Sequence, residues 1–327
     1  MKAALAVALV GTLVTVYLSS SYMPTAFSDD RWETEFTQFI TEHGKNYEDH
    51  VEYRKRMDIF KQNFIDIDTH NRNNDGSYAR AVNHMTDLTE EEIMAFRMGF
   101  VEPKSMTLNI AYPDNYPETG AVDWVSQGVV HTVKDQKSCG SCWAFSAAGA
   151  MESAYAISHP TNEIIDIPEQ EFVDCVKKSS GCRGGWMDYA FEYSKTHDLC
   201  TEAEYPYHAK NEKCHDTECT HAEYRVESFT NIPKGDAVAL NSALQNQPIA
   251  VAVDASKWSS YSSGVFTGCS SKARLNHGVL LVGVDAEGTW TIKNSWGPRW
   301  GENGFMRIAA GNSCGIADRA SYPTIVV

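Results

Sequence analysis

The sequence lacks several features that define other classes of protein. Positive charge is scarce, because 28 lysine and arginine residues stand against 43 aspartate and glutamate residues, for a formal net charge of −15. Such a surface repels nucleic acid and anionic membranes, so neither is expected as a partner. After residue 18 no apolar run is long enough to cross a membrane. There is also no Asn-X-Ser/Thr sequon, so sorting by an N-glycan is not expected.

The N-terminus has the pattern of a secretory signal. Met1-Lys2 precedes an apolar and small run from Ala3 to Leu18, and serines follow. This run is short for a membrane span, which favours a signal peptide cleaved near residues 21 to 26 over a retained anchor. We therefore expect a chain of the secretory pathway, free of the membrane after signal removal. Its destination would be a lysosome, a vacuole or the extracellular space.

None of the nine cysteines precedes Cys139. In a secretory chain these cysteines are expected to form disulfides, and an odd number leaves one thiol unpaired. Spacing alone does not choose among the many possible pairings.

The stretch Cys139-Gly-Ser-Cys142-Trp-Ala-Phe places a thiol where a run of small and apolar residues begins a helix, which we expect to end by Pro160. In the first turn of a helix, unpaired N–H groups and the helix dipole stabilise an anion, so Cys142 is biased toward the reactive thiolate. Taken alone, Cys-X-X-Cys would also fit a dithiol redox site, half a zinc site, or a structural disulfide beside a buried thiol.

Two distant residues supply what a cysteine nucleophile needs. A thiolate requires a neighbouring base that later protonates the leaving amine, and histidine can do both. His277 opens an apolar strand 135 residues after Cys142, and Asn294 follows at 152 residues in Asn-Ser-Trp-Gly-Pro-Arg-Trp-Gly. This asparagine would accept a hydrogen bond from one imidazole nitrogen and so turn the other toward the thiol. Neither a redox dithiol nor a zinc site needs such a pair.

These motifs resemble the papain family of cysteine proteases, and within it the cathepsin L branch. The Cys-Gly-Ser-Cys-Trp stretch matches the nucleophile signature of that family, with the histidine and the asparagine at the family's distances. The resemblance implies a catalytic set of Cys142, His277 and Asn294. It also implies an oxyanion hole made by Gln136 and the Cys142 backbone N–H, with Trp296 covering the His–Asn bond.

The resemblance further implies disulfides and a substrate pocket. It pairs Cys139 with Cys182, Cys175 with Cys214, and Cys269 with Cys314, which leaves Cys200 and Cys219 as a further pair and Cys142 free. The pocket for P2, the residue two before the scissile bond, would be lined by Gly185, Trp186, Met187, Ala252, Leu275 and, at its far end, Arg319. An apolar slot favours Leu, Val or Phe. Arg319 would exclude Arg and Lys and admit Glu, unless it turns to solvent or pairs with a carboxylate such as Asp318.

The residues before the peptidase match the proregion of cathepsin L-like enzymes. Helices are expected from Trp32 to Phe39 and from Glu52 to Asn71, the second carrying the pattern E-x3-R-x3-F-x2-N-x3-I-x3-N. Ion pairs such as those of Glu52 and Arg56 are expected to help hold the proregion on the peptidase domain until acid weakens them. Thr89 with Glu92 predicts a capping box that opens a helix ending near residue 96. Residues 81–87 match the family's G-x-N-x-F-x-D imperfectly, and residues 99–117 read as an extended linker suited to crossing the cleft.

The predicted organisation is a signal peptide (residues 1–21), an inhibitory propeptide with its linker (22–117) and a papain-like peptidase domain (118–327). The fold class is α+β. A helical domain would face an antiparallel β-barrel-like domain with strands at 249–253, 277–283, 289–293 and 304–308, and the cleft would lie between the two domains.

The predicted function is a cysteine endopeptidase made as a zymogen and autoactivated at acidic pH. Its partners would be protein and peptide substrates and its own propeptide, and it would act as a monomer without metal or other cofactor. The alternatives are a catalytically silent papain-fold binding protein and a dithiol oxidoreductase.

Overall fold

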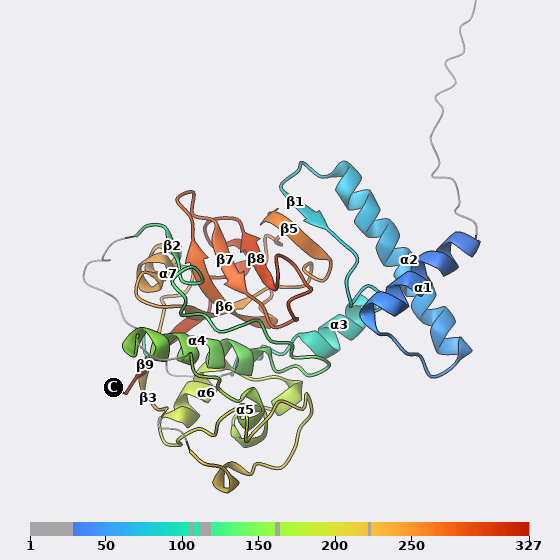
Figure 1. Cartoon of the computed structure of the whole chain (residues 1–327). Helices are drawn as coiled ribbons and strands as arrows, with labels where there is room; N and C mark the ends of the chain where they lie inside the picture. The colour runs from blue at the N-terminus through green and yellow to red at the C-terminus, as the bar shows by residue number, and fades with distance from the viewer. Residues whose placement is uncertain (1–28, 105–107, 111–118, 161–163, 222–223, 327) are drawn as a thin grey trace, which may run out of the picture.

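A computed structural model describes residues 29–104, 108–110, 119–160, 164–221 and 224–326 (Figure 1). The predicted signal peptide, its cleavage site and the predicted start of the peptidase domain at residue 118 lie outside these residues. Within them, no helix is both long enough and apolar enough to cross a bilayer.

The proregion contains both predicted long helices. They are α1 (Asp29–His43) and α2 (His50–Asn73), and they are followed by the short strand β1 (Tyr78–Arg80) and by α3 (Glu90–Arg97). The Asp49 side chain accepts hydrogen bonds from two N–H groups of the first turn of α2, which fixes where that helix begins. The capping box of Thr89 and Glu92 is present at the start of α3. Phe36, Phe39 and Phe60 form the buried contact between α1 and α2.

The ion pairs of α2 stay inside the proregion, which corrects the expectation that they dock it. Arg56 bonds Glu52 on the same helix and both carboxylate oxygens of Glu92 at the start of α3. Asn63 donates to two carbonyls of the loop that leads into α3. These contacts hold α3 in a fixed direction relative to α2. Figure 1 shows α3 leading from the helical pair toward the central helix α4.

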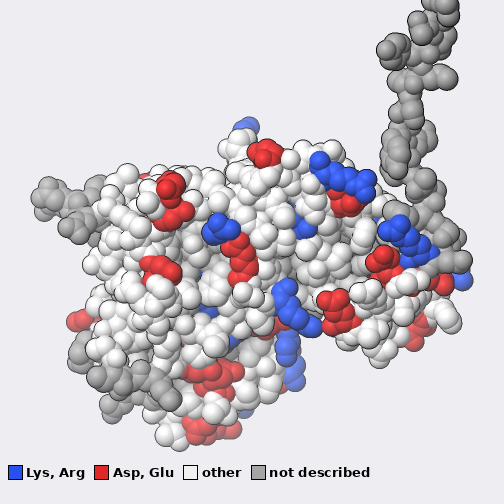
Figure 2. Space-filling view, turned by 45° about the horizontal axis from the view of Figure 1, so that its top comes forward, with Lys and Arg blue, Asp and Glu red and all other residues white. Residues whose placement is uncertain are grey.

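Docking of the proregion uses other residues. Arg97 pairs with Asp135 at 2.6 Å, and Arg299 donates to the carbonyl of Glu42 at 3.2 Å. Strand β1 pairs antiparallel with β5 (Tyr261–Phe266) at the edge of the peptidase sheet. Acidic and basic side chains are interspersed over the face in Figure 2, without a large patch of one sign.

The peptidase half is built around α4 (Cys142–Ser158), which is buried along most of its length. An alanine-rich sequence suits this position because small side chains let neighbouring elements approach the helix closely. Helices α5 (Glu169–Cys175) and α6 (Met187–Ser194) lie on one side of it, and strand β6 (His277–Val284) crosses the other (Figure 1). Helices α3 and α4 lie within one or two residues of their predicted bounds.

The sheet is open, which corrects the barrel-like description. Its strands run in the order β1-β5-β8-β7-β6-β4-β9-β3, with β2 paired to β6. The β5 and β8 strands are parallel, so the sheet is also not purely antiparallel. The predicted strands are present as β4 (Ile249–Val253), β6, β7 (Trp290–Lys293) and β8 (Phe305–Ile308). The remaining elements are β2 (Val122–Asp123), β3 (Val226–Asn231), α7 (Ala237–Leu244), β9 (Ala320–Ile325), and the short 3-10 helices Gly181–Arg183, Asp216–Glu218 and Ser313–Gly315.

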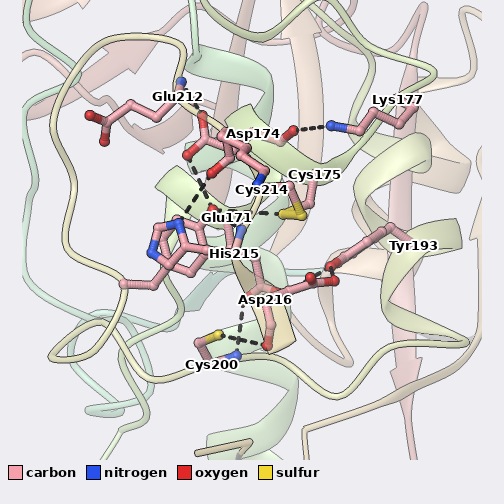
Figure 3. The surroundings of a disulfide bond; sticks show 12 residues. Glu171, Asp174, Cys175, Lys177, Tyr193, Cys200, Glu212, Cys214, His215 and Asp216 are labelled. Atoms are coloured by element: carbon pink, nitrogen blue, oxygen red, sulfur yellow. Dashed lines mark hydrogen bonds between the residues drawn. A yellow bond between two sulfur atoms is a disulfide. The ribbon is translucent and has the colours of Figure 1, made fainter. Parts of the chain in front are cut away.

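Four disulfides close the peptidase half. They join Cys139 to Cys182, Cys175 to Cys214, Cys200 to Cys219, and Cys269 to Cys314. Figure 3 shows the second and its surroundings, where the Asp174 carboxylate accepts the Glu212 N–H at 2.7 Å and the Tyr193 hydroxyl reaches Glu171 and Asp216. In this region disulfides and buried carboxylates, rather than helices or strands, hold a long irregular segment in place.

Candidate active site

Cys142 is the first residue of α4 and, within the described residues, the cysteine that forms no disulfide. Its neighbour in the motif, Cys139, is bonded to Cys182, so the pair cannot act as a dithiol. Ser141 occupies the N-cap position but makes no side-chain cap bond. The first N–H groups of the helix are therefore left for other partners near the thiol.

His277 lies beside this thiol. It is the first residue of β6, and the next residue, Gly278, packs so closely on α4 that a Cβ there would lie 3.2 Å from the carbonyl oxygen of Cys142. Asn294 directly follows β7, the antiparallel neighbour of β6, and its Oδ1 lies 2.7 Å from His277 Nε2. Because an amide oxygen only accepts, His277 Nε2 donates, and Nδ1 is left as the basic nitrogen. Among the described residues Nδ1 has no hydrogen-bond partner.

Trp296 and Gln136 complete the surroundings. The Trp296 ring lies 4.8 Å from the His277 ring, centroid to centroid, and is fully buried, so it shields the His–Asn bond from water. The Gln136 Oε1 accepts from Ser295 Oγ at 2.7 Å, which turns the side-chain NH2 toward the start of α4. There Nε2 donates to the Cys139 carbonyl at 2.9 Å and to the Arg97 carbonyl of the proregion at 3.1 Å. The Arg97 carbonyl of the proregion thus occupies the Gln136 NH2, a donor that could otherwise stabilise an oxyanion.

The linker crosses the thiol as extended chain. Gly99 N–H donates to the Asn276 carbonyl at 3.1 Å, Gly185 N–H donates to the Gly99 carbonyl at 2.9 Å, and Val101 N–H donates to the Gly185 carbonyl at 3.0 Å. A Cβ at residue 99 would lie only 1.9 Å from the Gly140 oxygen, so a glycine is required for this close passage. The crossing segment buries both Cys142 and His277 completely.

Burial sets the charge state of the covered pair. It raises the pKa of the Cys142 thiol to about 12, although backbone N–H groups around the sulfur oppose the shift. Burial also lowers the pKa of His277 to about 4, opposed by the bond to Asn294. Between these values the thiol and the imidazole are both neutral. The expected thiolate bias of the helix N-terminus is therefore outweighed while the proregion is in place.

Among the described residues, only three of the six assigned to the P2 pocket line one cavity. Trp186, Met187, Ala252 and Leu275 belong to one apolar cluster, and the proregion's Phe100 ring packs on Trp186 at 5.1 Å. Gly185 is the residue paired to the linker, and the backbone N–H of Ala252 donates to the Arg319 carbonyl. A small pocket is lined by Trp186, Met187 and Arg319, together with Leu108 and Ile110 of the proregion.

Arg319 pairs with a carboxylate that sequence reasoning did not identify. Its Nε donates to Glu102 Oε1 at 2.8 Å, and a second guanidinium nitrogen bonds the same oxygen. The Asp318 side chain, the partner considered from the sequence, is not used here, and only its backbone carbonyl accepts from Arg319. Glu102 lies in the exposed linker and belongs to no recognised motif, so its pairing with Arg319 could not be predicted from residue spacing.

A buried ion cluster lies below the catalytic groups and was also missed. Lys134 lies within 3.2 Å of carboxylate oxygens of Glu152, Asp166 and Glu169. The signal was present in the sequence, because Glu152 is a single carboxylate within the otherwise apolar α4, and such a group requires a partner. Lys134 lies two residues before Gln136, in an irregular segment whose Asp135 forms an isolated bridge with Trp296.

Comparisons with known proteins agree with this geometry. The model described as "Papain family cysteine protease" matches residues 118–324, and that described as "Cathepsin propeptide inhibitor domain (I29)" matches residues 36–93. Germination-specific cysteine protease 1 of Arabidopsis thaliana is 39% identical over 331 residues, covering 90% of this chain and 87% of the relative. Cathepsin L 2 of Paramecium tetraurelia is 42% identical over 254 residues, covering 76% and 78%. The solved digestive procathepsin L 3 of Tenebrio molitor larval midgut is 35% identical with a TM-score of 0.79, covering 89% of this chain and 98% of that one.

The charge state of the covered pair predicts a slow thiol. At pH 7.5, iodoacetamide should alkylate Cys142 in the intact proenzyme at least about 100-fold more slowly than after removal of the proregion, because the thiolate is the reactive form. Intact-mass spectrometry of both forms measures the rate, and Cys142→Ala protein gives the background labelling. Equal rates in the two forms would mean that the linker does not control ionisation of the thiol.

Proposed function

Because the chain belongs to the papain family of cysteine proteases, we propose that Cys142 is its nucleophile and that His277 is the base and acid of peptide hydrolysis. The chain is a cysteine endopeptidase made as a zymogen, with its I29 propeptide domain as an intramolecular inhibitor. The observation that carries the residue assignment is the 2.7 Å bond from His277 Nε2 to Asn294 Oδ1, since it leaves Nδ1 basic on the strand whose next residue, Gly278, packs on Cys142.

The chemistry runs in two halves once the linker has left. The proton of the Cys142 thiol passes to His277 Nδ1, and the thiolate adds to the peptide carbonyl. The Gln136 NH2 and the Cys142 backbone N–H stabilise the oxyanion, and the imidazolium gives its proton to the leaving amine. Water then loses a proton to His277, attacks the thioester and releases the acid, which returns the thiol. Asn294 keeps the imidazole in the tautomer that both halves need.

The proposed boundaries follow the predicted ones. Residues 1–21 act as a signal peptide, 22–117 as the propeptide and 118–327 as the peptidase, which works as a monomer on proteins and peptides. The enzyme acts in a lysosome or vacuole or outside the cell. Four disulfides in the peptidase half support passage through an oxidising compartment.

Replacement of the nucleophile tests this function. Cys142→Ala should abolish peptide hydrolysis and leave the proenzyme intact at acidic pH, because no other free thiol of the described residues can replace it. A trace of wild-type mature enzyme should still process the variant, which shows that its fold is retained. Mass spectrometry of wild-type digests should show internal cuts. Hydrolysis by the pure variant, or stepwise loss of terminal residues in the wild-type digest, would contradict the assignment.

The P2 pocket is proposed to accept apolar side chains and, through Arg319, glutamate. Support comes from the apolar cluster around Trp186 and from the carboxylate of Glu102, which Arg319 already binds in the proenzyme. Removal of the linker frees that guanidinium, and its side chain is 17% exposed even in the covered state. A partly desolvated arginine attracts a carboxylate and repels lysine and arginine.

A positional peptide library on the mature enzyme measures this preference. We expect acceptance of Leu, Val, Phe and Glu at P2 and rejection of Arg and Lys. Arg319→Ala should retain the apolar preference and reduce cleavage of peptides with glutamate at P2 by roughly 10-fold. Lys234→Ala is the matched control, because Lys234 borders the same pocket but is exposed and should leave the pattern unchanged. Strong acceptance of P2 arginine by the wild type would exclude Arg319 from the pocket.

Activation is proposed to follow acidification because a carboxylate holds the proregion in its folded form and a histidine is buried where the proregion meets the peptidase half. The bond to Arg56 lowers the pKa of Glu92, so the stability that this carboxylate contributes is lost as pH falls through its folded value. His84 lies near Arg97, Asp135, Lys45 and His43, and its buried Nε2 has no hydrogen-bond partner among the described residues. Burial, and next the charge of Arg97, lower the pKa of His84 to about 4.

The stabilising contribution of His84 changes with pH in the same direction as that of Glu92. Its pKa is lower in the docked state than its ordinary value of 6.5, so the docked state takes up fewer protons than the released state. Its contribution to docking is complete above pH 6.5 and is lost progressively between pH 6.5 and about 4. Acid therefore favours release of the proregion.

His84→Gln removes this titration and should shift the pH midpoint of processing downward by roughly half a unit. The measurement uses Cys142→Ala proenzyme with a trace of wild-type mature enzyme at a series of pH values, with and without the substitution. His50→Gln, at an exposed position of α2, is the control and should not move the midpoint. An unchanged midpoint in the His84 variant would remove this residue from the mechanism of release.

A further inference from the structure

One tyrosine hydroxyl connects the two parts of the chain that supply the oxyanion donors. Tyr207 Oη lies 2.8 Å from the Gln136 carbonyl oxygen and 2.6 Å from Ser141 Oγ. A carbonyl only accepts, so the single hydroxyl proton of Tyr207 goes to Gln136. Ser141 must then donate its own hydroxyl proton to Tyr207 Oη. Ser141 Oγ also lies 3.4 Å from the Cys139 carbonyl, but the 2.6 Å bond to Tyr207 is much shorter and takes the proton, so the arrangement has a defined direction.

Tyr207 is itself held by the helix that carries the thiol. Its ring packs edge-to-face on Phe145, in the first turn of α4, with 4.9 Å between centroids and an interplanar angle of 82°. Its backbone N–H donates to Glu202 at 3.0 Å. Burial raises the pKa of Tyr207, so the hydroxyl remains a donor through the acidic and neutral range.

The segment that Tyr207 spans is short and irregular. It runs from Gln136 to Ser141, includes Lys137 at a φ of 52°, and ends at the peptide that carries the Cys142 N–H. One donor of the hole, the Gln136 NH2, begins the segment, and the other, the Cys142 N–H, directly follows it. Ser295 fixes the side chain of Gln136, whereas Tyr207 bonds the backbone carbonyl of Gln136 at one end of the segment and the side-chain hydroxyl of Ser141 at the other. The distance between the two donors therefore depends on Tyr207.

We propose that Tyr207 is a positioning residue that sets the separation of the two oxyanion donors, an inference that rests on the proposed roles of Gln136 and Cys142. It touches neither substrate nor the reacting sulfur and acts through Gln136 and Ser141. Such donors stabilise a transition state only when they are aimed at the developing charge before the reaction begins. Loss of the hydroxyl lets one end of the segment move relative to the other.

The proposal separates two reactions of the same thiol. Peptide hydrolysis develops an oxyanion, whereas alkylation by iodoacetamide displaces iodide and develops none. A residue that positions only the oxyanion hole therefore affects hydrolysis and leaves alkylation unchanged. A residue that supports the fold around Cys142 and His277 affects both reactions.

Tyr207→Phe keeps the ring on Phe145 and removes only the hydroxyl. In the mature enzyme, processed in trans where needed, kcat for a peptide amide should fall roughly 5- to 10-fold with little change in KM, the size expected for one neutral hydrogen bond. The rate constant for alkylation and its pH profile should match those of the wild type. Ser141→Ala, which removes the other hydroxyl, should produce the same split between the two reactions.

Two further variants make the result decisive. Tyr205→Phe is the matched control, because the Tyr205 hydroxyl binds Asp174 in a neighbouring cluster and should leave kcat unchanged. In a Gln136→Ala background, Tyr207→Phe should have no further effect on kcat, because one of the two donors is already absent.

The outcomes separate this inference from the function on which it rests. If Gln136→Ala hydrolyses peptides at the wild-type rate, the proposed oxyanion hole is wrong. If Gln136→Ala is slow but Tyr207→Phe and Ser141→Ala both retain full kcat, only the role of Tyr207 is overturned. Equal losses in hydrolysis and alkylation, or a full additional loss in the Gln136→Ala background, would assign Tyr207 a general structural role and also overturn it.

Discussion

The inactive state of this proenzyme depends on the exclusion of water from the Cys142 sulfur. The Gly99 segment lies so close to Gly140 that neither solvent nor a side chain fits between them, and the thiol and the imidazole below are both neutral as a result. The Arg97 carbonyl, just before this segment, accepts from Gln136, and the Gly99 carbonyl within it accepts from Gly185, so both proposed substrate-binding donors are occupied. Inhibition therefore needs no distortion of the catalytic residues. They are already arranged, and only their environment prevents reaction.

The two parts of the chain are held together by different means. The proregion relies on aromatic contacts between its helices and on Arg56, which connects α2 to the start of α3. The peptidase half relies on the buried helix α4, an open sheet and four disulfides. Buried carboxylates are more numerous in the peptidase half, but burial raises the pKa of Glu169, Glu171 and Glu202 there, so acid protonates them without loss of folded-state stability. By contrast, Arg56 lowers the pKa of Glu92 in the proregion. Acid therefore weakens the inhibitor more than the enzyme, which remains constrained by covalent bonds.

Elements with a strong local signal could be predicted from the sequence, and those fixed by long-range contacts could not. Capping residues and a continuous apolar run defined α3 and β6 within one residue. By contrast, β5 contains two serines and a glycine and gains its strand form only from β1 and β8 on either side. The motifs singled out Cys142, His277 and Asn294 by residue type, and the structure shows the unpaired thiol and the predicted His277–Asn294 bond. Glu102, Arg97 and Tyr207 act through partners more than 30 residues away, and no spacing rule connects them.

Strand β1 has a further consequence because it belongs to the part of the chain that is lost. While it is paired, the outer edge of β5 has its backbone groups satisfied, from the Val265 N–H to the Ser260 carbonyl. Maturation exposes that edge, and an exposed edge is a template for pairing with another chain. In the mature enzyme the backbone groups along the outer edge of β5 are thus unpaired, whereas β1 pairs with them in the precursor. Gly264 provides no side chain to protect the middle of this edge of β5. Processing therefore creates a risk of self-association for the mature enzyme that the zymogen does not have.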